Sequence, residues 1–144
     1  MIKKAMPEDA GKAAELAVLL WPDNTLHALT DEFRDLMLNG KAQFFLKYER
    51  DIPVGFAQCG LRYDYVEGAS SSPVGYLEGI FVREEYRRKG YGKELLSECE
   101  KWARAEGCLE FASDCEDDNA DSFNFHKSMN FNEANRIICF TKRL

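Results

Sequence analysis

A basic, glycine-containing loop between a strand and a helix constrains the fold of this chain more than any other feature. The loop reads RRKGYG from Arg87 to Gly92, after the apolar run VGYLEGIFV and before the amphipathic run GKELLSECEKWARAEG. A helix N-terminus has free N–H groups and a positive dipole end, and glycines let the backbone come close, so the loop is typical of an anion site. A solvated basic turn explains it equally well. The loop lacks the GK[ST] ending of a Walker motif and the third glycine of the dinucleotide fingerprint.

Composition and charge narrow the class of protein. The 144 residues are enough for one domain, residues 1–144, with a hydrophobic core. The formal net charge of −6 argues against nucleic acid as the main partner. No apolar run approaches the roughly 20 residues that span a bilayer, and no apolar segment follows the basic N-terminal residues, so we expect a cytoplasmic protein without a membrane partner. Five cysteines without a CxxC pair, and only two histidines, predict reduced thiols and no metal site.

The hydrophobic periodicity predicts a mixed α/β domain with a central sheet and helices on both faces. The predicted order is β-α-α-β-β-β-α-β-α-β. The predicted strands are 2–6, 42–49, 52–63, 74–82, 109–114 and 136–144, and the predicted helices are 7–21, 30–40, 92–107 and 119–129. We expect Thr30 to cap the second helix and Gly40 to end it.

Two motifs and the element order together resemble the GCN5-related N-acetyltransferases (GNAT). Arg87 to Gly92 fits the pattern [R/Q]-x-x-G-x-[G/A], which in that family forms the acetyl-CoA pyrophosphate loop. A second family pattern has Asn at a helix start, Tyr seven residues later and then Gly-Phe. Here it reads Asn119, His126 and Asn130-Phe131, so the Asn and the Phe fit whereas the Tyr and the Gly do not. The resemblance in element order covers essentially the whole chain.

Five further stretches resemble the short bacterial aminoglycoside 6'-N-acetyltransferases. They are LLWP, DYVEG, SSPVGYLEGIFV, GCLEFASD and RIICFTKR. This resemblance implies transfer of acetyl from acetyl-CoA to an aminoglycoside 6'-amine in a direct ternary complex, without a metal, and it allows for a homodimer. Cys115, beside Asp114, leaves a covalent acyl-enzyme open. Two alternatives remain: acetylation of another amine, such as a polyamine or a peptide N-terminus, and an acyl-CoA-binding sensor without chemistry.

The resemblance implies three contacts with acetyl-CoA. The strand backbone at Ile80, Phe81 and Val82 would pair with the pantetheine arm and supply an N–H donor to the oxyanion. The loop would bind the pyrophosphate through Arg87, Arg88, Lys89, Gly90, Tyr91 and Gly92. Asn119 would contact the pantetheine arm, although a simple helix cap is an equal alternative.

The substrate amine arrives as an ammonium, for which carboxylates are suitable partners. Glu78 is an acidic residue inside an apolar strand, and Asp114 ends a strand at the carboxyl edge where α/β sheets bind ligands. Either is a candidate catalytic base, and the alternatives are an outward-facing Glu and a solvated acidic turn. By resemblance, Trp21 and Tyr65 line the substrate site, and Trp21 is equally a core residue. Asn135 stands where relatives tend to carry an acidic residue.

His126 stands where the wider family has a Tyr that protonates the leaving thiolate. Seven residues correspond to about two helical turns, so His126 and Asn119 project from the same helix face. A neutral imidazole could serve as the general acid, because the reference pKa of histidine lies near neutral pH. An ordinary packing role is an equal alternative.

Overall fold

A five-stranded sheet forms the centre of the computed structural model, which describes residues 1–144. The strands lie in chain order: β1 (Ile2–Lys4), β2 (Ala42–Glu49), β3 (Ile52–Arg62), β4 (Val74–Val82) and β5 (Phe111–Ser113). Neighbours are antiparallel from β1 to β4, and β5 runs parallel to β4. The sheet confirms the predicted mixed α/β class.

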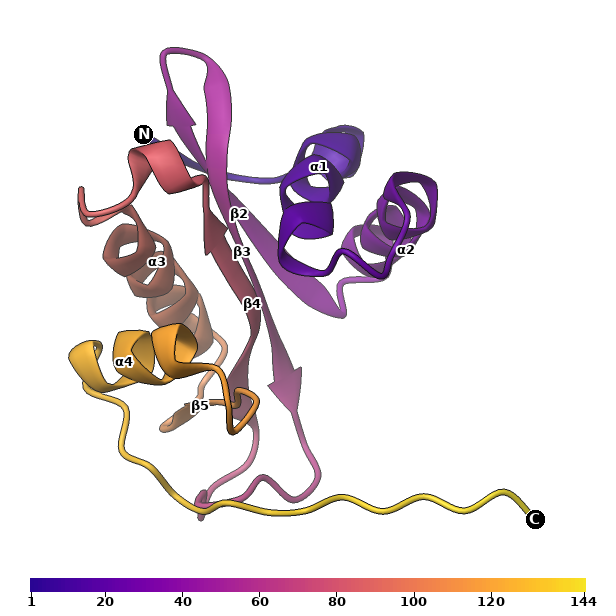
Figure 1. Cartoon of the computed structure of the whole chain (residues 1–144), viewed down its shortest axis with the longest axis vertical. Helices are drawn as coiled ribbons and strands as arrows, with labels where there is room; N and C mark the ends of the chain where they lie inside the picture. Colours follow the sequence, from indigo (N-terminus) through magenta and orange to yellow (C-terminus); the bar gives the residue numbers. More distant parts are fainter.

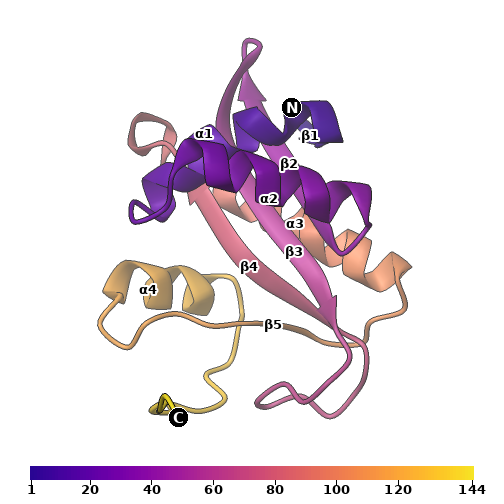
Figure 2. The same ribbon diagram turned by 90° about the vertical axis from the view of Figure 1, so that its right-hand side faces the viewer.

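Helices cover both faces of the sheet, as predicted (Figures 1 and 2). One face carries α1 (Ala10–Leu20) and α2 (Leu26–Leu38), and the other carries α3 (Tyr91–Ala105) and α4 (Ala120–Ser128). Two short 3-10 turns, Pro7–Asp9 and Glu84–Tyr86, precede α1 and α3. No helix is both long enough and apolar enough to cross a membrane.

Two hydrophobic cores hold the helices against the sheet. Under α1 and α2, the apolar faces of the helices meet the side chains of β2 and β3, with Phe33, Phe44 and Phe56 fully buried. Under α3, Leu95 and Cys99 pack on residues of β3 and β4. Burying one large apolar side chain stabilises a fold by about 1.5–3 kcal/mol, so these two cores fix the positions of β3 and β4 firmly.

Strand β4 has two irregularities, a β-bulge and an edge that is only partly paired. Leu77 pairs with Cys59 and Gly79 with Gln58, so Glu78 is an extra residue at a β-bulge. Bulges redirect side chains and are frequent beside active sites. On its other side, β4 pairs with β5 only from Gly75 to Leu77. The backbone of β4 after Leu77 therefore has no strand neighbour on that side.

The start of the second helix differs from the prediction. The helix begins at Leu26 and is capped by Thr25, whose hydroxyl accepts a hydrogen bond from the Ala28 N–H at 3.1 Å. Thr30 lies inside the helix and donates its hydroxyl proton to the Leu26 carbonyl. Both threonines are residues that favour a cap, and in the structure Thr25 holds that position. Gly40 has a φ of +71°, as expected just after a helix.

The predicted final strand, 136–144, is wrong for this structure. The chain after α4 runs along one end of the molecule as an extended segment and pairs with no strand (Figure 1). Ile138 is 81% exposed and Phe140 is 88% exposed. The alternating apolar pattern is present, but the segment has no strand partner and no surface in which to bury these side chains.

Candidate active site

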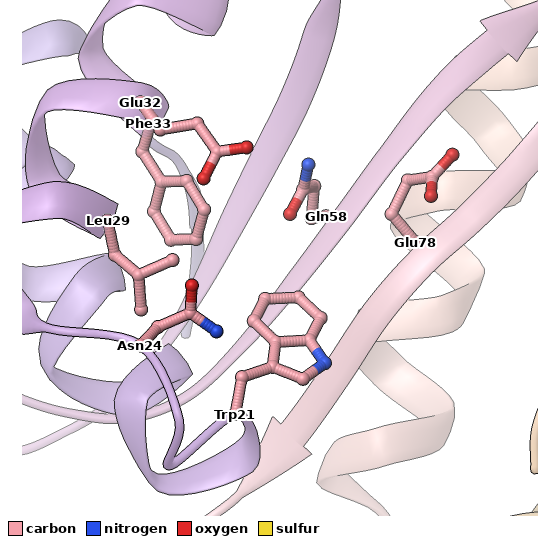
Figure 3. Close-up of a pocket in the computed structure, with 7 residues that line it drawn as sticks. All are labelled: Trp21, Asn24, Leu29, Glu32, Phe33, Gln58 and Glu78. Atoms are coloured by element: carbon pink, nitrogen blue, oxygen red, sulfur yellow. The ribbon is translucent and has the colours of Figure 1, made fainter. Parts of the chain in front are cut away.

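A pocket of about 320 Å³ opens between the α1–α2 connection and the strands β3 and β4 (Figure 3). Its lining combines an apolar wall with four polar side chains: Trp21, Asn24, Leu29, Glu32, Phe33, Gln58 and Glu78. Glu32 comes from α2 and Glu78 from the bulge of β4, so two carboxylates from different elements border the same space. Such a lining suits a ligand with more than one cationic group.

Trp21 is both a core residue and a wall of this pocket, so the two interpretations of its sequence position are compatible. Its indole lies edge-on to Phe56, with 6.1 Å between the ring centroids. It also covers Gly79, where a Cβ atom would lie 2.5 Å from the indole Cη2. The glycine beside the bulge therefore lets the indole approach the strand closely.

The two predicted acidic residues belong to one network. Arg62 Nη2 donates to Glu78 at 2.9 Å and 3.2 Å from the two carboxylate oxygens. The Arg62 guanidinium carbon lies 3.5 Å from the centroid of the Tyr76 ring. The Tyr76 hydroxyl in turn donates to the Asp114 carboxylate. Burial, followed by this hydrogen bond, raises the pKa of the Tyr76 hydroxyl well above its ordinary value, so Tyr76 is a neutral donor to Asp114.

The residues predicted to hold the pantetheine arm lie on the part of β4 that β5 leaves free. Ile80, Phe81 and Val82 pair on one side with β3, and no strand lies on the other. The Val82 carbonyl accepts a hydrogen bond from Arg87 Nε at 2.8 Å. Arg87 therefore ties the anion loop to the end of this open strand edge.

The anion loop has the geometry of a helix N-terminal site. Gly90 is the N-cap of α3 with a φ of +81°, and Arg88 also has a positive φ, of +65°. The first N–H groups of α3 point out of the helix beside these cations. Gly92 also packs closely against α4, because a Cβ there would lie 3.0 Å from the Phe125 ring.

The side chain of Tyr91, also in the loop, contacts residues of β2. Its hydroxyl donates to Glu49, and the Lys47 ammonium lies 4.3 Å from the centre of its ring. Lys47 also pairs with Glu94 at 2.6 Å. These contacts give Tyr91 a structural role in fixing the first turn of α3.

His126 lies where β4 and β5 separate. Its Nδ1 is 2.7 Å from the Ser122 carbonyl oxygen, to which it donates a proton, and Nε2 lies 2.8 Å from the Ser113 hydroxyl oxygen. Ser113 Oγ is also 3.3 Å from the Leu77 carbonyl oxygen. Asn119 caps α4, with its side-chain oxygen accepting from the Ser122 N–H at 3.0 Å. Both residues thus have structural roles beside the open edge of β4.

Tyr65 and Asn135 lie apart from the pocket lining but meet each other through Glu67. The Tyr65 hydroxyl donates to Glu67, and Asn135 Nδ2 donates to the same carboxylate at 2.8 Å. Asn135 replaces the acidic residue expected at its position, and Glu67 places a carboxylate beside it. Sequence reasoning missed Glu67, together with Asn24, Glu32, Gln58, Arg62 and Tyr76.

Comparison with known protein families agrees with this strand–loop–helix geometry. The model of the acetyltransferase (GNAT) family matches residues 12–131. This chain belongs to the GNAT family. The structure brings together no group of His, Cys, Asp and Glu side chains that could hold a metal ion.

This GNAT protein has relatives along nearly its whole length. It is 38% identical to an aminoglycoside N(6')-acetyltransferase type 1 of Stenotrophomonas maltophilia, covering 96% of this chain and 90% of that protein. It is 31% identical to AAC(6')-Iy, solved in complex with the bisubstrate analogue CoA-S-monomethyl-acetylneamine, with a TM-score of 0.94 and coverage of 100% and 98%. The 6'-N-acetyltransferase AAC(6')-IG of Acinetobacter haemolyticus, solved without ligand, has 33% identity, a TM-score of 0.94 and coverage of 100% and 99%.

Proposed function

We propose that residues 1–144 form one N-acetyltransferase domain, which transfers acetyl from acetyl-CoA to the 6'-amine of an aminoglycoside. The similarity to aminoglycoside 6'-N-acetyltransferases over nearly the full length of both chains carries this proposal. The acidic pocket supports it, because an aminoglycoside is a polycation and Glu32 and Glu78 border the same cavity. Such an enzyme confers resistance to the antibiotics that it acetylates.

The chain offers suitable groups for each part of acetyl-CoA. The N-terminus of α3 and the cations Arg87, Arg88 and Lys89 suit the pyrophosphate, and the free edge of β4 suits the amide groups of the pantetheine arm. Acetyl-CoA supplies the acetyl group as a thioester. A backbone N–H of β4 is then placed to donate to the oxyanion that develops on the acetyl carbonyl.

Acetyl transfer also requires an amine that has lost its proton. Glu78 and Asp114 attract the ammonium form, and one of them, directly or through a water molecule, accepts a proton before attack. The amine nitrogen then bonds to the acetyl carbon as the carbon–sulfur bond breaks. His126 is our candidate for returning a proton to the sulfur. With a proton on both ring nitrogens, its Nε2 donates to Ser113 Oγ, and the Ser113 hydroxyl passes its own proton to the sulfur at the open edge of β4.

A turnover panel separates this proposal from its two alternatives. Release of CoA is followed with a thiol reagent in the presence of kanamycin, tobramycin, neomycin, spermidine or a peptide with a free N-terminus. An aminoglycoside 6'-N-acetyltransferase releases CoA with the first three, and the product carries acetyl on the 6'-nitrogen. An acetyltransferase of another amine prefers spermidine or the peptide, and a sensor binds acetyl-CoA but releases no CoA with any of them.

We further propose that the enzyme works in the cytoplasm. All five cysteines are free thiols, and Cys59, Cys99 and Cys108 are buried. Such unpaired thiols are typical of a reducing compartment. Fractionation of cells that produce the protein tests this placement.

A homodimer is the assembly that we propose. The exposed apolar side chains of Ile137, Ile138 and Phe140 support a second copy as their cover. Light scattering coupled to size exclusion should therefore give twice the chain mass for the wild type, and the mass of one chain for Phe140→Asp. A wild-type protein that elutes with the mass of one chain at micromolar concentration contradicts the proposal.

A further inference from the structure

We propose that Arg62 is a specificity-determining residue, whose guanidinium occupies the position on Glu78 that a substrate ammonium takes. Binding of the amine is then an exchange of one cation for another. The proposal rests on the proposed acetylation of a cationic amine.

The position of Arg62 is unusual for a surface arginine. It ends β3 and pairs in register with Val74, four residues before Glu78 on the neighbouring strand. Its side chain therefore runs along β4, lies over the Tyr76 ring and ends at the carboxylate that borders the pocket. Glu78 lies at the bulge of β4 and accepts the hydrogen bonds of the Arg62 guanidinium.

The charges around this arginine are those expected of a receptor for ammonium groups. Glu78 and Glu32 border the pocket, and Asp114 joins the network through Tyr76. Arg62 is the cation in direct contact with this network, and it neutralises Glu78. A substrate ammonium that approaches Glu78 therefore meets a carboxylate that already has a positive partner.

The contact is suited to exchange. The Arg62 side chain is 44% exposed and that of Glu78 is 35% exposed, and ion pairs at such sites contribute little to stability. One guanidinium nitrogen makes both contacts with Glu78. When an ammonium displaces it, the guanidinium keeps its stacking on Tyr76 and its access to solvent. No buried charge is left unpaired by the exchange.

The exchange explains how the site can prefer polycations. An amine with one ammonium group only replaces the guanidinium at Glu78, so it gains little binding free energy there. A substrate with several ammonium groups also gains contacts with the other carboxylates of the site. With Arg62 in place, a ligand therefore needs several ammonium groups to bind tightly.

The test compares Arg62→Gln with Arg62→Lys, which keeps the positive charge, and with Arg104→Gln, which removes a positive charge from the last turn of α3 on the opposite face of the sheet. Arg62→Gln should lower the KM for kanamycin by about three- to tenfold, the scale of one nearby like charge, without raising kcat. Arg62→Lys and Arg104→Gln should stay within about twofold of the wild type. In a Glu78→Gln background, Arg62→Gln should change the KM less, because Arg62 and the substrate no longer compete for a carboxylate at position 78.

Calorimetry with spermidine and the CoA-bound protein provides a readout without turnover. The exchange predicts tighter spermidine binding by Arg62→Gln than by the wild type. An unchanged or weaker affinity overturns the proposal, as does a raised KM that Arg62→Lys restores, since Arg62 would then hold Glu78 in place for the substrate. Failure of the proposed function has a different signature, namely a wild type that acetylates no aminoglycoside.

Discussion

At the residue scale, we propose that the network of Glu78, Tyr76 and Asp114 holds the amine. Glu78→Gln and Asp114→Asn preserve shape and remove charge. Each should raise the KM for the aminoglycoside or lower kcat, with losses of about 1–3 kcal/mol where a partner is left unsatisfied. Acetyl-CoA affinity, measured by calorimetry, should not change. Wild-type kcat/KM in both variants would remove the main support for a carboxylate receptor.

His126 is one of two positions, with Asn130, at which this chain departs from the family pattern. His126→Phe should lower kcat by at least about tenfold, a small part of the usual effect of general-acid catalysis, with little change in either KM. Ser113→Ala removes the hydrogen-bond partner of Nε2 and should lower kcat in the same direction. Steady-state release of free CoA is the measurement. If kcat is unchanged in His126→Phe, the imidazole serves only to join α4 to β5.

Gly79 controls the position of Trp21. In Gly79→Ala, the new methyl group would meet the indole at 2.5 Å, so the indole must leave its place on β4. Such overpacking typically costs about 1–3 kcal/mol, and the aminoglycoside KM should rise with the displaced pocket wall. The same change at Gly11 in α1, where a Cβ meets no atom within 4 Å, should leave the KM unchanged and should not lower the stability, because Ala favours a helix more than Gly does. Thermal unfolding and steady-state kinetics of the two variants provide the comparison.

At the element scale, we propose that the α3 N-terminus and its preceding loop together bind the pyrophosphate. Gly90 has a φ of +81°, a conformation that Asn and Asp adopt more readily than other residues. Gly90→Asp should weaken acetyl-CoA binding by about tenfold or more, because like charges a few ångströms apart cost on the order of 1–4 kcal/mol near a surface. Gly90→Asn has the same shape without the charge and should bind more tightly than Gly90→Asp. Equal affinities in Gly90→Asp and the wild type, measured by calorimetry, would place the pyrophosphate elsewhere.

The elements themselves were largely predictable, because each has a local signal. The basic loop lies between an apolar strand and an amphipathic helix, and the structure has it there. The start of α2 was misplaced because two threonines compete as caps. The segment 136–144 has the alternation of a strand, but a strand also needs a neighbour, and no local pattern supplies one.

The site was predictable only where a residue conflicts with its local surroundings. Glu78 is conspicuous as an acid inside an apolar strand, and it lies at the bulge and borders the pocket. Glu32 and Arg62 are ordinary in their own segments. Their importance comes from packing α2 against the sheet and from the register of β3 with β4, which are properties of the fold.

At the scale of the whole molecule, β4 borders both the acidic pocket and the strand edge that we propose for acetyl-CoA. The bulge of β4 and its neighbour β3 border the acidic pocket beneath α1 and α2 (Figure 3). The free edge of the same strand leads to the N-terminus of α3. We therefore propose that an amine in the pocket and a thioester along this edge meet at this stretch of β4.

The most direct test of this account is the release of CoA by the wild-type protein with kanamycin as acceptor, followed by determination of the acetylated nitrogen by NMR. The account predicts turnover with kanamycin, much weaker turnover with spermidine or a peptide, and acetyl on the 6'-nitrogen alone. Binding of acetyl-CoA without any release of CoA would contradict catalysis. Turnover that is restricted to spermidine or the peptide would contradict the aminoglycoside as substrate.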